Sequence, residues 1–434
     1  MLSSIYPLIS TNSKTSLMEM ITRLYNCFKM WAIHLRQQLY VARLRRRKTV
    51  KIVFFAMNLP MWRYQHLYEE LSKYDCFKLY IVLSPAIDAP EEVRNNDLQA
   101  MREFFQQKGI SFIDYDPISP CVVRECIDPD ILFYPQPYGA MFHPLHDFSN
   151  FKDKLLCYYP YAFWTAKGNW SYNTEFHVYA WKLFYSTELH RLDARAISWR
   201  KDKNVEVVGY PNTDDFLAFD RKNDSLWKKQ PAKKKRLIWA PHFSIPNGQP
   251  RLLDMSNFLW MADLMVSMAK KYKDQIQIAF KPHPHLKREL YKNLDWGKEK
   301  TDRYYQLWND MDNTQLETSG FVDLFMTSDA LIHDCGSFTV EYLYSKNPVM
   351  YMLRDEEYKI STQNDFGIKA LNVHYKGKNE QDVVSFIEQV LLQGKDPMKA
   401  EREKFYKEYL LPPRGESVAK ATAEIIVKAL NKHT

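Results

Sequence analysis

Three short stretches of the chain combine basic or imidazole side chains with residues that stiffen or tighten the backbone. In the first two, an apolar run at 236–240 continues into Pro-His-Phe-Ser, and another at 275–280 continues into Lys-Pro-His-Pro-His. Each proline fixes its own φ and keeps the preceding residue out of the helical region, so these side chains extend from rigid turns. Ammonium and imidazole groups held in this way suit phosphate binding. The candidates are His242, Ser244, Lys281 and His283.

The third stretch, residues 328–352, is the most informative because its pattern predicts a strand, a tight turn, a helix and a second strand. Gly336 and Ser337 stand where the helix must begin, and Pro348 follows its end. The first N–H groups of a helix lack intrahelical partners and carry the positive end of its dipole, so they attract phosphate. An ordinary strand-to-helix connection is the alternative. The candidate residues are His333, Asp334, Gly336, Ser337, Thr339 and Glu341.

Two of these residues also have structural interpretations. Asp334 is favoured as a cap of the turn or as a group that orients His333, rather than as a direct participant in chemistry. Glu341 lies in the first turn of the predicted helix, where a carboxylate also stabilises the helix dipole.

The three stretches require a framework that brings several strand ends together. Apolar runs separated by helical patterns predict parallel strands, and open parallel sheets bind ligands at the carboxyl ends of their strands. We therefore predict an α/β protein with two Rossmann-like, doubly wound domains facing a cleft. The expected strands lie at 50–57, 77–83, 111–115, 131–134, 155–159, 182–185 and 205–208, and then at Leu237, Gln275, Ala330 and Val349.

The length of 434 residues also predicts two domains, because it exceeds the usual size of one hydrophobic core. A polar segment at 221–235, which contains Pro231, is predicted to link a first domain at 49–220 to a second at 236–415, with a C-terminal helix within 416–434. No apolar run approaches the roughly 20 residues of a membrane-spanning helix. Six cysteines without CxxC spacing predict a reducing cytoplasm and no zinc site.

The positive charge is concentrated in residues 1–48. The chain has a formal net charge of +8, and this segment alone holds nine lysine and arginine residues against Glu19. Apolar residues recur at helical spacing between Leu17 and Leu44, which predicts a basic amphipathic helix. The helix either binds an anionic membrane surface or packs on the first domain. Because the rest of the chain is formally neutral, nucleic-acid binding is not expected.

Four motifs, in the same order, resemble those of the CDP-glycerol glycerophosphotransferases, enzymes that build teichoic acids and related capsular polymers. A Gly-Tyr-Pro-Arg-x-Asp motif of that family resembles residues 209–214, with Gly209, Tyr210, Pro211 and Asp214. An Ala-Pro-Thr-Phe motif resembles 240–243, and a basic-x-His-Pro motif resembles 281–284. The family's Thr-Asp-Tyr-Ser-Ser resembles 333–337. The resemblance covers residues 130–415 and is clearest in the second domain.

The resemblance implies a GT-B fold with the nucleotide donor in the second domain and the acceptor in the first. It implies transfer of an alditol phosphate, with glycerol phosphate favoured, from a CDP-activated donor to a hydroxyl of a cell-surface glycan or polymer, with release of CMP. Lys281 would neutralise phosphate charge and His283 would donate to a phosphate oxygen or the leaving group. The amides of 336–338 would hold the diphosphate, and Glu341 would accept ribose hydroxyls. No cofactor and no metal is implied.

One motif of that family is missing here. Its His-Gly-Thr-Pro-Leu-Lys motif, whose histidine acts as the base, is expected after the strand at Leu155, where this chain has Tyr-Tyr-Pro-Tyr-Ala-Phe-Trp. His143 and His146 are the candidates to replace that histidine.

Two alternatives to this function stay open. One is a nucleotide-sugar-dependent GT-B glycosyltransferase of capsule or lipopolysaccharide synthesis, and the other is an inactive membrane-associated scaffold. In the favoured scheme we expect a cytoplasmic protein, peripheral at the inner face of the bacterial membrane, that acts on a glycan or lipid-linked acceptor.

Overall fold

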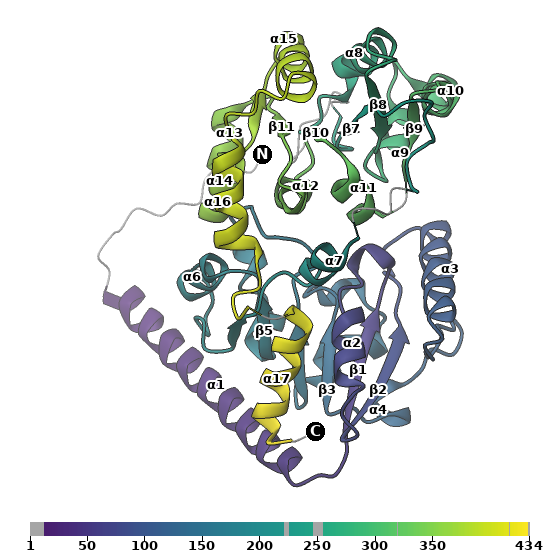
Figure 1. Cartoon of the computed structure of the whole chain (residues 1–434). Helices are drawn as coiled ribbons and strands as arrows, with labels where there is room; N and C mark the ends of the chain where they lie inside the picture. The colour runs from purple at the N-terminus through teal and green to yellow at the C-terminus, as the bar shows by residue number, and fades with distance from the viewer. Residues whose placement is uncertain (1–12, 221–224, 246–254, 319, 416, 433–434) are drawn as a thin grey trace.

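The computed structural model describes residues 13–220, 225–245, 255–318, 320–415 and 417–432, which form two α/β halves, one above the other (Figure 1). Each half contains a parallel sheet of six strands. The strand order is β2-β1-β3-β4-β5-β6 in the first sheet and β12-β11-β10-β7-β8-β9 in the second. The prediction of two doubly wound, Rossmann-like sheets is confirmed.

The first half alternates strands with helices. Its strands are β1 (Val50–Ala56), β2 (Phe77–Leu83), β3 (Ile131–Tyr134), β4 (Leu155–Tyr158), β5 (Ala180–Tyr185) and β6 (Val205–Val207). Its helices are α1 (Ser13–Arg45), α2 (Gln65–Leu71), α3 (Glu91–Gln107), α4 (Val123–Cys126), α5 (Glu175–Tyr179), α6 (Glu188–Ile197) and α7 (Thr213–Ala218).

The second half repeats this alternation. Its strands are β7 (Lys235–Ala240), β8 (Ile276–Phe280), β9 (Thr314–Leu316), β10 (Ala330–His333), β11 (Val349–Met352) and β12 (Tyr375–Gly377). Its helices are α8 (Phe258–Lys271), α9 (Leu286–Lys292), α10 (Gly297–Asp310), α11 (Val322–Thr327), α12 (Phe338–Glu341), α13 (Glu356–Ser361), α14 (Asp365–Leu371), α15 (Glu380–Ser385) and α16 (Lys399–Phe405). The last helix, α17 (Val418–Leu430), belongs to the first half.

The sequence-based strand predictions differ from the structure at the sheet edges. The strand expected at 111–115 is wrong, because only Ile113 pairs with β2, through an isolated parallel bridge to Val82. The carboxylate of Asp114 accepts the N–H of Tyr115 and pairs with Arg102 at this point of the chain. The edge strands β9 and β12 were not predicted, since each has three residues and no apolar run.

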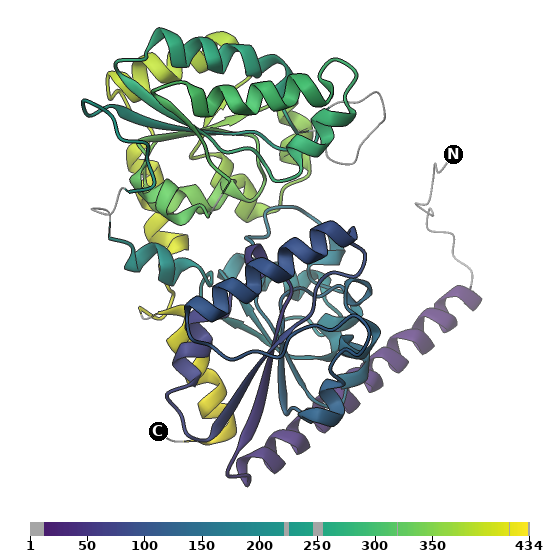
Figure 2. The same cartoon turned by 90° about the vertical axis from the view of Figure 1, so that its right-hand side faces the viewer.

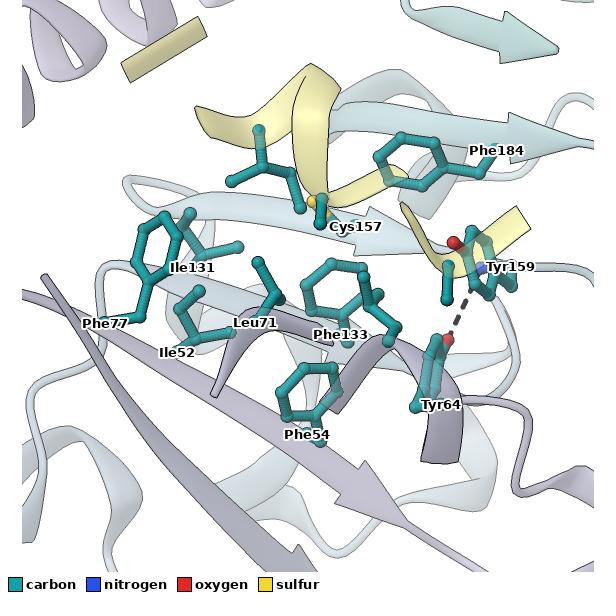
Figure 3. Close-up of a cluster of buried hydrophobic side chains, with 14 of the residues drawn as sticks. Ile52, Phe54, Tyr64, Leu71, Phe77, Ile131, Phe133, Cys157, Tyr159 and Phe184 are labelled. Carbon is teal, nitrogen blue, oxygen red and sulfur yellow. Dashed lines mark hydrogen bonds between the residues drawn. The ribbon is translucent and has the colours of Figure 1, made fainter. Parts of the chain in front are cut away.

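Both faces of each sheet are buried, which explains the nearly continuous apolar runs. In the first half, α2, α3 and α17 contribute side chains to the core on one face, and α4, α5 and α6 to the core on the other. Figure 3 shows the first of these cores, where the rings of Phe54 and Phe133 stack 4.8 Å apart. At its margin the N–H of Tyr159 donates to the hydroxyl of Tyr64.

The C-terminal helix α17 returns to the first half, where it lies beside α2 in both views (Figures 1 and 2). The carboxylate of Asp214 accepts the N–H groups of Val418 and Ala419 at 2.9 and 3.0 Å, so it caps the start of this helix. Gly209 has a φ of +106°, and a Cβ on it would lie 2.8 Å from a side-chain carbon of Val418. The 209–214 motif therefore lets α17 approach closely and also caps it.

Among the described side chains of the N-terminal helix α1, those that contact the first half lie between Lys29 and the C-terminal end of the helix. Ile33, Gln37, Val41 and Leu44 are buried there, and Gln37 donates to the carbonyl oxygen of Tyr179 at 2.8 Å. The rest of the helix projects away from both halves (Figure 2). No helix within the described part of the chain is long and apolar enough to span a membrane.

We predict that Gly209→Ala lowers the free energy of unfolding by about 2–4 kcal/mol, because it combines an unfavourable φ with a clash against α17. Urea unfolding measures the effect. Gly109→Ala is the matched control, since Gly109 also has a positive φ of +64° but nothing lies within 4 Å of a Cβ there. That control should lose only about 1 kcal/mol. Equal losses in the two variants would contradict the proposed clash.

Candidate active site

Four neighbouring strands of the second sheet, β8, β7, β10 and β11, end at one edge and carry most of the predicted phosphate-binding residues. The structure brings together His242 after β7, Lys281 and His283 after β8, and the turn at 334–337 after β10. The imidazole rings of His242 and His283 lie 5.1 Å apart, and the ring of Phe243 packs on both of them. Strands that are well separated in sequence thus meet in one polar site.

The two imidazoles of this site are neutral and share one tautomer. Nδ1 of His242 accepts from the hydroxyl of Ser244 at 2.8 Å, while that hydroxyl accepts the N–H of Met255. Nδ1 of His283 accepts the N–H of His285 at 3.1 Å. Burial lowers the pKa of His242 to about 4 and that of His283 to about 3. Each ring therefore carries its proton on Nε2 and can donate it to an oxygen without being charged.

Asp334 holds these turns together. Its carboxylate accepts the N–H of His242 at 2.5 Å and the N–H of Asn257, at the start of α8, at 2.6 Å. The hydroxyl of Tyr351 donates to the Asp334 carbonyl oxygen at 3.1 Å. Burial raises the pKa of Asp334 to about 6. Asp334 thus joins the turns after β7 and β10 to α8, which is a positioning role.

The turn after β10 is buried where it leaves the strand and exposed at its tip. Nδ1 of His333 faces the carbonyl oxygen of Cys335 at 3.1 Å, and the Thr339 hydroxyl donates to the same oxygen at 3.3 Å. Ser337, by contrast, is exposed. Gly336 does not have a positive φ, and nothing lies within 4 Å of a Cβ built on it. The fold therefore does not require glycine at 336, while the missing side chain leaves the backbone accessible.

Two lysines lie near this turn, and only one was predicted. Burial lowers the pKa of Lys281 to about 8, and it does the same to Lys359 of α13. Both ammonium charges act on the thiol of Cys335. Lys359 lies in α13, further from the end of β11 than Lys281 is from the end of β8, so the position of the strand ends did not identify it. Among the residues with described positions, no group of three or more His, Cys, Asp or Glu side chains could hold a metal.

Glu341 lies between the two halves of the protein. Its carboxylate accepts a hydrogen bond from the hydroxyl of Tyr210, in the 209–214 motif, and both side chains are buried. Burial raises the pKa of Glu341 to about 7, while the charge of Arg63 and the Tyr210 hydroxyl act to lower it. Arg63 itself donates to the carbonyl oxygen of Tyr161 at 3.0 Å. The structure thus places Glu341 with first-half residues, which the sequence did not suggest.

The loop after β4, where the family histidine was expected, packs between the halves. The ring of Phe163 lies 4.2 Å from that of Tyr210 and 5.5 Å from that of Phe366 in α14. The N–H of Asn364 donates to the carbonyl oxygen of Thr165 at 2.9 Å, and Ala166 bridges to Gln363. This loop holds the first half against α14 through apolar packing and backbone hydrogen bonds.

His143 and His146, the alternative candidates for the base, have their neighbours within the first half. His146 is buried, with Nδ1 at 2.9 Å from the Ser84 hydroxyl and Nε2 at 3.0 Å from the carbonyl oxygen of Cys121. Burial lowers its pKa to about 4. His143 is half-buried and accepts the N–H of Leu145 through Nδ1. The described contacts do not bring either ring to the residues of the second sheet.

Comparison with known proteins identifies the family. Residues 165–420 match the model of the family described as CDP-Glycerol:Poly(glycerophosphate) glycerophosphotransferase, which is more than half of the chain. The chain belongs to this family. It is accordingly a transferase of the CDP-glycerol glycerophosphotransferase type, and the predicted resemblance is confirmed. A search of curated proteins finds no match.

Solved structures confirm the GT-B-like fold. A putative UDP-N-acetylglucosamine 2-epimerase from Listeria monocytogenes is 13% identical, with a TM-score of 0.56 over 89% of this chain and 98% of the other. A variant of the wall teichoic acid polymerase TagF is 11% identical, with a TM-score of 0.55 over 97% and 99% of the two chains. At these identities the similarity shows the architecture alone.

We predict that Tyr210→Phe costs more stability at pH 8 than at pH 5. The folded-state pKa of Glu341, about 7, lies above the unfolded value of ~4.3, so its contribution to stability is greatest below ~4.3 and is lost as the pH rises through about 7. Without the Tyr210 hydroxyl this pKa rises further, and the buried carboxylate loses a donor, which costs about 1–3 kcal/mol. Urea unfolding at the two pH values measures the difference. In a Glu341→Gln background the same substitution should show no such pH dependence, and a pH-dependent loss there would refute the assignment to Glu341.

Proposed function

We propose that this transferase moves an alditol phosphate, with glycerol phosphate favoured, from a CDP-activated donor to a hydroxyl of a glycan or lipid-linked polymer acceptor and releases CMP. The observation that supports this most strongly is the set of groups at the strand ends of the second sheet. Two neutral imidazoles with protons on Nε2, the ammonium group of Lys281 and the open backbone at Gly336 lie around one site. A variant of TagF, a neighbour in fold, has been soaked with CDPG.

The proposed reaction is attack by an acceptor hydroxyl on the phosphorus that carries the alditol, with the bond to the CMP oxygen breaking. Phosphoryl transfer requires mainly positioning and neutralisation of charge. Lys281 would neutralise the phosphates, while His242 and His283 would donate from Nε2 to phosphate or leaving-group oxygens. The N–H groups at 336–338 would complete the phosphate contacts. This scheme uses no cofactor and no metal.

In the first half, we infer that His143 is better placed than His146 to accept the proton of the acceptor hydroxyl. Both ring nitrogens of His146 have partners and the ring is buried. Among the described residues, His143 is hydrogen-bonded through Nδ1 only, and the ring is partly exposed. Nε2 of His143 therefore remains available for proton transfer.

The donor proposal is tested by incubating purified protein with CDP-glycerol, CDP-ribitol, UDP-sugars and CMP-sugars and identifying the nucleotide released. CMP should appear from a CDP-alditol, and exclusive release of UDP would favour a glycosyltransferase instead. Gly336→Ala should reduce CMP release by about 10–100-fold, since a Cβ would block phosphate from the turn. Its free energy of unfolding should change by no more than about 0.5 kcal/mol.

The matched control for this variant is Gly320→Ala, because Gly320 also lacks a positive φ and has open space around a Cβ. It should retain both stability and CMP release. If the two variants behave alike, Gly336 does not contact the donor.

We further propose that α1 holds the transferase at an anionic membrane surface, the inner face of the bacterial cell membrane. The apolar stripe recognised in the sequence does not pack on the protein. Its exposed members are Ile21, Leu24, Tyr25, Phe28, Trp31, Leu35 and Leu39. The first half is instead contacted by a different face of the helix, through Ile33, Gln37, Val41 and Leu44. Basic residues follow at Arg43, Arg45 and Arg46, and each contributes about 1 kcal/mol near anionic lipid.

Replacing Phe28 and Trp31, which are 66% and 58% exposed, by serine should weaken co-sedimentation with phosphatidylglycerol vesicles by at least about tenfold. The fold should be unaffected because neither ring belongs to a core. The control is Ile118→Ser with Leu294→Ser, two exposed aliphatic residues outside α1. Equal vesicle binding by both double variants would rule out the α1 stripe as the membrane contact.

A further inference from the structure

Lys359 is a buried cation that forms no ion pair within the described part of the chain, although the charge of the more distant Asp334 carboxylate acts on it. It is only 9% exposed, and its Nζ lies 4.8 Å above the ring of Tyr351 and 3.7 Å from the sulfur of Met255. Within the described part of the chain, no carboxylate lies within 4.0 Å of this ammonium group. Burying a charge is costly unless it is paired. The lowered pKa of Lys359, about 8, reflects that cost.

The place of Lys359 in the fold links it to the donor site. Tyr351, beneath its ammonium group, donates to the carbonyl oxygen of Asp334, whose carboxylate fixes the backbone of His242. Lys359 lies over Tyr351 of β11, and Lys281 directly follows β8, so the two lysines lie on either side of the central pair β10 and β7 in the sheet order. Both charges act on Cys335, the residue that precedes Gly336. The turn is therefore flanked by two ammonium groups.

We propose that Lys359 is the second cation of the donor site and binds the diphosphate of a nucleoside-diphosphate-linked donor together with Lys281. A diphosphate esterified at both ends has one negative charge on each phosphate, which matches one lysine on each flank of the turn. The inference rests on the proposed function, since it assigns Lys359 to the same donor. It adds a residue of α13 to a site otherwise formed by the turns after β7, β8 and β10.

A purely structural role makes a different prediction. The alkyl stem of a lysine can cover apolar surface while the head group adds nothing. Lys359→Met keeps the stem against Tyr351 and Met255 and removes only the charge. If Lys359 serves the donor, the variant without ligand should be as stable as the wild type or more stable, because a buried unpaired charge is lost. If Lys359 serves the fold, the variant should lose stability.

The test measures binding of CDP-glycerol and of CMP to the full chain by calorimetry, with thermal unfolding of each variant. Lys359→Met should weaken CDP-glycerol binding by about 10–100-fold and CMP binding by less, since CMP lacks the second phosphate. Lys359→Arg should restore most of the affinity. Lys369→Met removes an exposed lysine of α14 and should match the wild type.

Unchanged CDP-glycerol affinity in Lys359→Met would overturn the assignment, as would equal weakening for CMP or a loss of stability that parallels the loss of binding. If the wild type binds neither nucleotide, the proposed function fails and the inference fails with it. If the wild type binds CDP-glycerol and Lys359→Met gives any of the three contradicting results, only the role of Lys359 is refuted and the proposed function stands.

Discussion

The candidate site in the second half of the protein depends on the hydrogen bonds of the buried Asp334 carboxylate. It satisfies two backbone N–H groups, one in the turn after β7 and one at the start of α8, so it fixes these elements relative to the turn after β10. The cost of keeping it buried is visible in its pKa, raised to about 6. In exchange the site gains a fixed geometry, because the Asp334 carboxylate holds the backbone of His242 and so sets the orientation of its ring. Asp334 thus positions the imidazole of His242 through the backbone and not through a contact with the ring.

A second set of contacts joins this site to the first half, and the 209–214 motif provides them. Gly209 allows the approach of α17, Asp214 caps that helix, and Tyr210 reaches Glu341 at the end of α12. The helix that begins at the open turn is therefore anchored at its other end by the first half. The motif links the placement of the turn after β10 to the placement of the whole first sheet.

Much of this arrangement was predictable, for reasons specific to the residues concerned. Lys281, His283, His242 and Asp334 were found because each follows an apolar run, and parallel strands align such positions at one edge. The partner of Glu341 was not predictable, since Tyr210 is 131 residues away in the chain and periodicity carries no information about such a contact. The sequence also did not determine whether the apolar stripe of α1 packs on the protein. The helix has two faces, and the pattern identified the exposed face and not the one that packs on the first half.

The altered loop after β4 bears on whether the protein is a catalyst or a scaffold. A general base typically raises the reaction rate about 10²–10⁴-fold. A reaction governed by positioning and charge neutralisation can therefore proceed with the base at another position of the first half. In the loop where the family histidine was expected, this chain packs Phe163 against Tyr210 and Phe366, at the contact between the halves. A protein that needed only its fold would gain stability by replacing the buried Lys359 with an apolar residue. The presence of that buried charge beside the neutral imidazoles favours a working donor site whose acceptor is activated from a different part of the first half.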